Sequence, residues 1–278
     1  MSSHWQRVTS LTSTERVAVL GLINHTEVVL EREAIDDSRR RSVVHGWSGE
    51  HWLLHDDVSV VGYANVTHGA IPSVEMVGGG IDESLLRALL EVHGEIDWWQ
   101  RDTHSRPANA IRTLQLMSRP LLDLPPAHGF QGAIRAFEPG VDDDDWLTQN
   151  NAAFADHPEQ GTWRKAELQL RLEEPWFDPS GFLLLHIDGQ LAASCWTRVH
   201  ELYRERFGEI YVLTVGPEFQ GQGLGKTMLS AGLLALRRKG VLRAELFVDA
   251  DNTSAVALYQ AMGFIVQRED QLLRYVAP

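Results

Sequence analysis

The stretch EIYVLTVGPEFQGQGLGK, residues 209–226, determines how the rest of this chain is interpreted. Its first half is rich in β-branched and bulky apolar residues, which predicts a strand over 210–215. Gly216-Pro217 ends that strand, because proline donates no backbone N–H. Glycines then occupy every second position from Gly221 to Gly225, and a helix is predicted over 227–239. A strand, a glycine-rich turn and a helix N-terminus together predict an anion site, since free amides and the helix dipole favour negative charge.

Three phosphate-binding patterns compete for this turn. A dinucleotide-binding G-x-G-x-x-G that starts at Gly221 needs glycine at position 226, where the chain has Lys226. A Walker A loop, G-x-x-x-x-G-K-[ST], fits Gly225-Lys226-Thr227 but needs glycine in place of Gln220, so a nucleotide hydrolase stays an alternative. The pattern [Q/R]-x-x-G-x-[G/A] fits Gln220, Gly223 and Gly225 without change.

The third pattern resembles the pyrophosphate loop of the GCN5-related N-acetyltransferase (GNAT) family. Residues 252–264, NTSAVALYQAMGF, resemble the later motif of that family, N-x-x-A-x-x-x-Y-x-x-x-G-F, at the expected distance. The resemblance implies an α/β (α+β) fold with a mixed, mostly antiparallel central sheet flanked by helices, and acetyl-CoA as co-substrate. The positions that it assigns to acetyl-CoA are Leu213, Thr214, Val215, Gln220, Gly221, Gln222, Gly223, Leu224, Gly225, Lys226 and Asn252.

The order of predicted elements occurs twice, which indicates two copies of one α/β module. The first copy has predicted helices over 11–30, 34–44 and 85–93, a hairpin of strands 52–55 and 58–66, and strands 73–77 and 111–117. The second has a strand over 133–137, helices over 146–154 and 165–173, a hairpin of strands 182–186 and 191–199, and strands 210–215 and 244–248. The predicted organisation is a degenerate N-terminal GNAT-like domain (1–125), a linker (126–132) and a catalytic GNAT domain (133–278). The proline-rich stretch 119–129 suggests this boundary. The first copy is called degenerate because GGGIDE, residues 78–83, lacks the Q-x-x-G-x-G pattern.

A closer resemblance lies in NNAAFADHPEQGTW (150–163), WFDPSG (176–181) and WTRVH (196–200). These segments are similar to the mycothiol synthases, a tandem branch of the same family, and the resemblance is strong from about 133 to 264. It implies acetylation of the cysteinyl α-amine of desacetylmycothiol, a cysteine–glucosamine–inositol conjugate. It also implies substrate-binding roles for Glu159, Arg198, Glu209 and Tyr259, and for Asp37 from the first copy. Arg198 stands where that branch has lysine, so its contact is expected to differ.

The expected chemistry is direct attack of a neutral amine on the thioester within a ternary complex. An α-amine titrates near pH 8, so a modest general base is sufficient to deprotonate it. Glu209, expected at the start of the central strand, is the candidate base and acts directly or through a water. An unpaired strand N–H near 213–215 is the candidate donor to the developing oxyanion. Tyr259 is the candidate proton donor to the leaving thiolate. Asn252 caps the next helix, binds the pantetheine arm, or does both.

Composition limits the alternatives further. A net charge of −13 argues against nucleic-acid and anionic-membrane partners. Cys195 is the single cysteine, so it forms no intramolecular disulfide, and its apolar surroundings predict an inert, packed thiol. No leader, membrane-spanning run or metal-ligand cluster is evident, so a cytoplasmic, monomeric enzyme without a metal is expected. An acetyltransferase for another amine, such as an aminoglycoside or a protein N-terminus, and a non-catalytic CoA-binding regulator remain alternatives.

Overall fold

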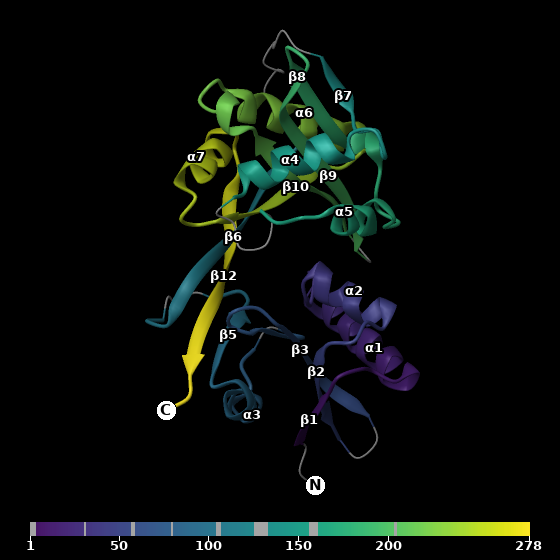
Figure 1. Ribbon diagram of the computed structural model, residues 1–278, viewed down its shortest axis with the longest axis vertical. Helices are drawn as coiled ribbons and strands as arrows, with labels where there is room; N and C mark the ends of the chain where they lie inside the picture. The colour runs from purple at the N-terminus through teal and green to yellow at the C-terminus, as the bar shows by residue number, and fades with distance from the viewer. Residues whose placement is uncertain are drawn as a thin grey trace. The chain divides into compact units, whose positions relative to one another are not determined.

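A computed structural model gives the fold and describes residues 4–30, 32–56, 59–78, 80–103, 107–124, 133–155, 161–202 and 205–278 (Figure 1). The chain forms two compact units. Unit 1 contains Met1–Gln115, Asp249–Asp251 and Arg268–Pro278, and unit 2 contains Leu116–Val248 and Asn252–Gln267. Strands β6 (Ala110–Pro120) and β12 (Ile265–Val276) have residues in both, so neither unit is one continuous stretch of sequence. The expected linker, 126–132, lies outside the described residues.

The sheet of unit 1 is mixed and mostly antiparallel. Its first four strands pair antiparallel in sequence order: β1 (His4–Val8), β2 (Glu50–His55), β3 (Val60–Thr67) and β4 (Ser73–Met76). Strand β5 (Glu95–Gln100) pairs parallel with β4 and antiparallel with β12. The helices are α1 (Ser13–Leu30), α2 (Asp37–His45) and α3 (Glu83–His93). The predicted hairpin, third strand and three helices are confirmed, whereas β1 and β5 were not predicted.

Alternating residues of the unit 1 strands serve two separate cores, as the period of a strand requires. Trp52 packs in the core that contains Leu85 and Leu89 of α3, and the adjacent Leu53 packs in the core that contains Val19 of α1 and Val43 of α2. The helices therefore cover both faces of this sheet. Aspartate caps fix two helix starts: Asp36 accepts N–H bonds at the start of α2, and Asp82 does so at the start of α3.

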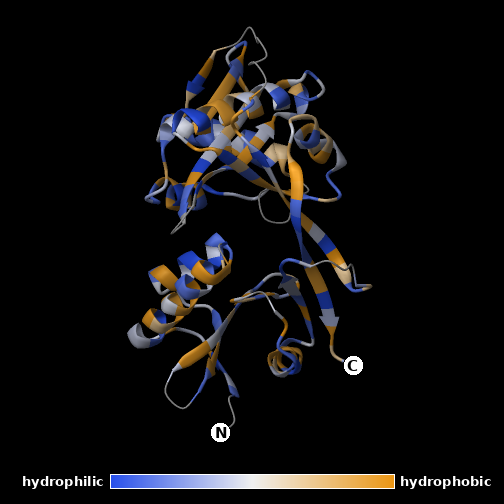
Figure 2. Cartoon of the chain, turned by 180° about the vertical axis from the view of Figure 1, so that it is seen from behind, coloured by the Kyte–Doolittle hydropathy of each residue, from blue (hydrophilic) through white to orange (hydrophobic). Residues whose placement is uncertain are grey.

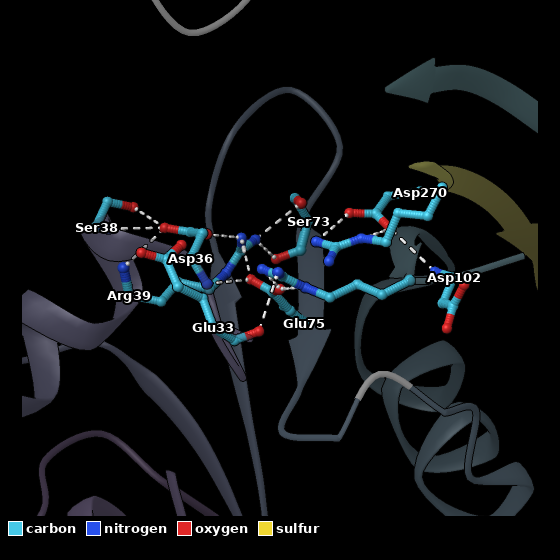
Figure 3. A network of polar contacts seen from close by, with 10 residues as sticks. Glu33, Asp36, Ser38, Arg39, Ser73, Glu75, Asp102 and Asp270 are labelled. Atoms are coloured by element: carbon cyan, nitrogen blue, oxygen red, sulfur yellow. Dashed lines mark hydrogen bonds and ion pairs between the residues drawn. The ribbon is translucent and has the colours of Figure 1, made fainter. Parts of the chain in front are cut away.

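A buried ion-pair network fixes the start of α2 against the sheet of unit 1 (Figure 3). Glu75 of β4 accepts a hydrogen bond from Arg101 Nε at 2.6 Å and one from Arg39 Nη1 at 3.2 Å. The main-chain N–H of Asp36 donates to the same Glu75 carboxylate at 3.0 Å, and the Asp36 carboxylate pairs with Arg39. Burial by itself raises the pKa of Asp36, but Arg39 and the neighbouring donors leave that pKa well below its usual range. The first residue of α2, Asp37, follows this anchor directly.

Unit 2 repeats the same arrangement. Its strands β7 (Ile134–Ala136), β8 (Phe182–Ile187), β9 (Gln190–Leu202) and β10 (Glu205–Val215) pair antiparallel in order, and β11 (Arg243–Asp249) pairs parallel with β10. The helices are α4 (Asp143–Ala153), α5 (Lys165–Leu172), α6 (Leu224–Arg238) and α7 (Thr253–Ala261), with short 3₁₀ turns at Pro179–Gly181 and Pro217–Phe219. Each unit thus has a hairpin, a third antiparallel strand, a helix and a parallel strand. This confirms the predicted tandem α/β fold with mostly antiparallel sheets.

Helices cover both faces of the unit 2 sheet as well. Helix α6 packs through Leu229, Leu233 and Leu236 on a core that includes Cys195 and Ile210. Helices α4 and α5 cover the opposite face, in an aromatic core that contains Trp146, Phe182 and Trp196. Figure 2 shows helices that carry both hydrophilic and hydrophobic residues, as expected of helices packed on a sheet. None of the helices in the described part of the chain is long and apolar enough to cross a bilayer.

Candidate active site

Strand β10 separates from β11 partway along its length. Its ladder with β9 continues to Val215, which faces Ala193, whereas the parallel pairing with β11 covers only Gly208 and Glu209. A bulge interrupts the β9 ladder between Ile210 and Val212, just beyond the last β11 pair. Bulges of this kind bend a strand and increase its local twist. The second half of β10 therefore has one edge that is paired with β9 and one edge that is not paired with β11.

The hydrogen-bond pattern of the ladder identifies which amides lie on the unpaired edge. The N–H of Gly216 donates to the carbonyl oxygen of Ala192 at 2.9 Å. In an antiparallel ladder only alternate residues bond to a given neighbour, so Thr214 also points its N–H towards β9. The N–H groups of Leu213 and Val215 consequently point to the side of β11. These are donors of the kind expected from the sequence for an acyl oxygen or a pantetheine chain.

The glycine loop ends directly in helix α6. Gly221 and Gly223 have φ values of +75° and +80°, and a Cβ atom at either position would meet nothing within 4 Å. Gly223 is the N-cap of α6 and provides no side-chain cap, so the first-turn amides of the helix face outward from an uncapped end. The helix begins at Leu224 and not at Thr227 as predicted, because the left-handed Gly223 completes the turn early.

Close packing explains the third glycine of the motif. A Cβ atom on Gly225 would lie 3.3 Å from Leu258 Cδ2 of α7 and 3.8 Å from Val215 Cγ2 of β10. The first turn of α6 is therefore held against the end of β10 and against α7. Among the other predicted cofactor positions, Gln220 and Gln222 are exposed, Leu224 is buried and Lys226 is half-buried. The Thr214 side chain is buried and bonds to Ser194 and Gln149, and its N–H points towards β9, so Thr214 offers neither of these groups to a ligand on the unpaired edge.

Glu209 lies inside β10, and not at the start of the strand as predicted, because the strand begins at Glu205. Its side chain is 13% exposed, and its Oε2 lies 2.7 Å from Nε2 of His200 on β9. The His200 ring stacks on Phe207 with centroids 4.6 Å apart. His200 was not among the site residues predicted from the sequence. His200 is two residues from Arg198 on one strand, so the two side chains lie on the same face of the sheet. This spacing could have predicted that His200 lies near the site.

Arg198 is held by aromatic side chains on that same face. It is the partner of Glu209 across the β9–β10 ladder. Its guanidinium lies 4.6 Å from the ring centroid of Trp176, and Trp176 meets the ring of Tyr211 edge-on at 5.2 Å. The Tyr211 hydroxyl in turn accepts a hydrogen bond from Arg171 Nε at 2.9 Å. A planar guanidinium stacks on an indole ring, whereas an ammonium cannot stack in this way. Arginine at position 198 can therefore make a stacking contact with Trp176 that lysine would not make.

Helix α7 carries two further predicted site residues. Asn252 caps the helix, because its Oδ1 accepts from the Ala255 N–H at 3.1 Å, which confirms that part of the prediction. Tyr259 is buried in the core under α6 and packs against Phe264. Burial raises the pKa of its phenol above the ordinary value, and no described residue forms a hydrogen bond with its hydroxyl. The group is therefore protonated at neutral pH.

Cys195 is packed, as predicted. Burial raises the pKa of its thiol to about 12, so it is a poor nucleophile at neutral pH. In the other predicted substrate positions, Asp37 accepts a hydrogen bond from Arg41 Nη1 at 2.9 Å within unit 1. Glu159 lies outside the described residues. Within the described ranges, no group of three or more His, Cys, Asp or Glu side chains is arranged to hold a metal ion.

Comparison with known proteins identifies the family. The acetyltransferase (GNAT) family matches residues 146–264, which include the β10 strand, the glycine loop and α7. A mycothiol acetyltransferase of Streptomyces coelicolor is 37% identical over 97% of this chain and 94% of its own length. A GCN5-related N-acetyltransferase of Sphaerobacter thermophilus superposes over 98% of this chain and 95% of its own, with a TM-score of 0.69 at 19% identity. A tandem GNAT protein from the clavulanic acid pathway superposes over 99% of this chain and 98% of its own, with a TM-score of 0.65 at 15% identity. This chain belongs to the mycothiol acetyltransferase family, a tandem branch of the GNAT acetyltransferases.

Proposed function

We propose that this enzyme transfers the acetyl group of acetyl-CoA to the cysteinyl α-amine of desacetylmycothiol. The observation that carries the proposal is the arrangement of one strand: β10 presents Glu209, then two N–H groups on an unpaired edge, then a glycine loop at a helix N-terminus. Those three features suit an amine, a thioester and a diphosphate in that order. The relatives that are 37% identical over nearly the whole chain, and are named mycothiol acetyltransferases, support this substrate class.

The diphosphate of acetyl-CoA is assigned to the first turn of α6. Backbone N–H groups of Leu224, Gly225 and Lys226 lack intrahelical partners there, and the helix dipole adds a favourable field for an anion. The pantetheine arm then extends along the edge of β10 that β11 leaves unpaired, where Leu213 and Val215 provide main-chain donors. This placement brings the thioester towards the bulge at Tyr211 and hence towards Glu209.

The proposed reaction is a single displacement. The amine nitrogen attacks the thioester carbonyl carbon, a C–N bond forms, and the C–S bond breaks as the tetrahedral intermediate collapses. Glu209 takes the proton that the amine loses, directly or through a water. A β10 main-chain N–H donates to the carbonyl oxygen while negative charge develops on it. Tyr259, protonated at neutral pH, donates to the departing CoA thiolate.

The residues proposed to bind the amine substrate are assigned from their charge and position. Arg198 is the cross-strand partner of Glu209 and is supported by Trp176, so its guanidinium can hydrogen-bond to sugar hydroxyls at a fixed distance from the base. Glu159 and Asp37 remain predicted polyol-binding carboxylates. Arg198→Lys keeps the charge but loses the stacking on Trp176. We therefore expect this variant to have a raised KM for desacetylmycothiol and an unchanged KM for acetyl-CoA.

The test is a thiol-release assay with acetyl-CoA and three acceptors: desacetylmycothiol, glucosamine and cysteine. We expect turnover to be highest with the intact conjugate. Glu209→Gln, which has nearly the same shape, should lower kcat by about 10²-fold to 10⁴-fold and leave the Kd for acetyl-CoA unchanged. Equal turnover with an unrelated amine would remove the substrate assignment, and full kcat in Glu209→Gln would remove the base assignment.

A further inference from the structure

His200 is fixed against Glu209 by contacts on more than one side. Its Nε2 lies 2.7 Å from Glu209 Oε2, and its side chain is 7% exposed. Its ring is parallel to that of Phe207, with an interplanar angle of 3° and a centroid separation of 4.6 Å. Arg243 of β11 lies 5.0 Å from the same Phe207 ring and pairs with Glu245. The imidazole is therefore one member of a packed row that crosses β9, β10 and β11, and it cannot turn away from the carboxylate without disturbing that row.

The contact also assigns one proton when Glu209 is ionised. A carboxylate only accepts hydrogen bonds when ionised, so a contact of 2.7 Å with ionised Glu209 requires hydrogen on His200 Nε2. That bond occupies Oε2. No described residue donates to Oε1 of Glu209, which leaves this second oxygen to receive the proton of the amine. The pair thus fixes both the rotation of the carboxylate and the oxygen that acts.

We propose that His200 is a positioning residue for acetyl transfer, holding Glu209 so that Oε1 faces the attacking amine. The inference rests on the proposed function, since it assigns the orientation of the proposed base. His200 itself touches neither substrate in this scheme. The nearest charged ladder partners of Glu209 are Arg198 on β9 and Glu245 on β11, and both are retained in the variants described below.

Two polar, non-titrating variants of His200 differ only in reach. The amide nitrogen of glutamine takes the place of Nε2, whereas that of asparagine ends near the place of Nδ1 and falls short of Glu209. We expect His200→Asn to lower kcat by about 10-fold to 100-fold, the loss expected for one hydrogen bond to a charged group, with the KM for acetyl-CoA unchanged. His200→Gln should keep kcat within about 3-fold of the unmodified enzyme. His186→Asn, on β8 and outside this row, is the matched control and should leave kcat unchanged.

A cycle with Glu209→Gln separates this inference from the proposed function. If His200 acts through Glu209, His200→Asn should have no further effect on kcat once Glu209 is glutamine. A full additional loss in the double variant would overturn the inference, and so would equal kcat values for the asparagine and glutamine variants. A normal kcat in Glu209→Gln alone would instead refute the base assignment and leave the fold unaffected.

A measurement on the unmodified protein covers the case in which a His200 variant does not fold. Nitrogen-15 NMR of labelled histidine distinguishes a protonated ring nitrogen from an unprotonated one. We expect Nε2 of His200 to carry hydrogen at neutral pH. An unprotonated Nε2 would mean that the ring cannot donate to the ionised carboxylate, and the positioning role would be wrong.

Discussion

Gly223→Ala is the sharpest test of how the glycine loop binds its ligand. Gly223 has φ +80° and ψ 4°, a left-handed conformation that costs an L-residue about 1–2 kcal/mol. A Cβ atom there would meet no protein atom within 4 Å, so no clash adds to that strain. The new methyl group would instead project from the N-cap of α6, beside the amides assigned to the diphosphate. We therefore expect a small loss of stability and a larger loss of acetyl-CoA affinity.

Gly189→Ala is the matched control. Gly189 also has φ +80° and open space around its Cβ position, but it lies in the turn between β8 and β9. Both variants should lose about 1–2 kcal/mol in urea unfolding. Only Gly223→Ala should weaken acetyl-CoA binding, by about 10-fold or more if one hydrogen bond to the charged diphosphate is lost or misaligned.

Isothermal titration with two ligands gives the decisive comparison. Acetyl-CoA contains the diphosphate, whereas S-acetylpantetheine lacks it. We expect Gly223→Ala to raise the Kd for acetyl-CoA and to leave the Kd for S-acetylpantetheine as it is in the unmodified protein. Equal Kd values for acetyl-CoA in the two alanine variants, at equal loss of stability, would refute the assignment of the diphosphate to the first turn of α6.

Three further predictions concern packing, proton donation and pH. A Cβ atom on Gly232 would lie 2.4 Å from Cys195 Sγ, so Gly232→Ala should lower the unfolding free energy by about 1–3 kcal/mol, and adding Cys195→Ala should recover part of it in urea titrations. Tyr259→Phe should lower kcat by at least about 10-fold and change the unfolding free energy by less than about 1 kcal/mol, because no described residue bonds to its hydroxyl; unchanged kcat would exclude the acid role. The hydrogen bonds from Arg135, at 2.5 and 2.6 Å, hold the pKa of Asp142 below its usual value, so this ion pair stabilises the fold above about pH 4 and its contribution is lost as the pH falls below that. The stability difference between the unmodified protein and Asp142→Asn should therefore be constant near neutral pH and shrink in acid, and a constant difference down to pH 2 would contradict this.

Local patterns were sufficient to predict most elements and the family. Residues 252–264 combine a cap, a helical period and a glycine stop, and α7 forms there with Asn252 as its cap. The glycine loop was predicted from the spacing of its glycines alone. That spacing is informative because Gly221 and Gly223 have positive φ values, a conformation that glycine adopts more readily than other residues. Strand β5 was not predicted, since EIDWWQ (95–100) lacks clear alternation and its partners are β4 and the distant β12. Pairing over such sequence separations leaves no local signal.

The sequence by itself determined that a strand, a glycine loop and a helix follow one another, because each depends on residues only a few positions apart. The tertiary structure alone decided that β11 leaves β10 after Glu209, that Thr214 turns its side chain into the core, and that His200 meets Glu209. These facts depend on strand register, bulge position and the packing of helices on each face. Such quantities are set by contacts between segments that are distant in the chain, and no short window of residues contains them.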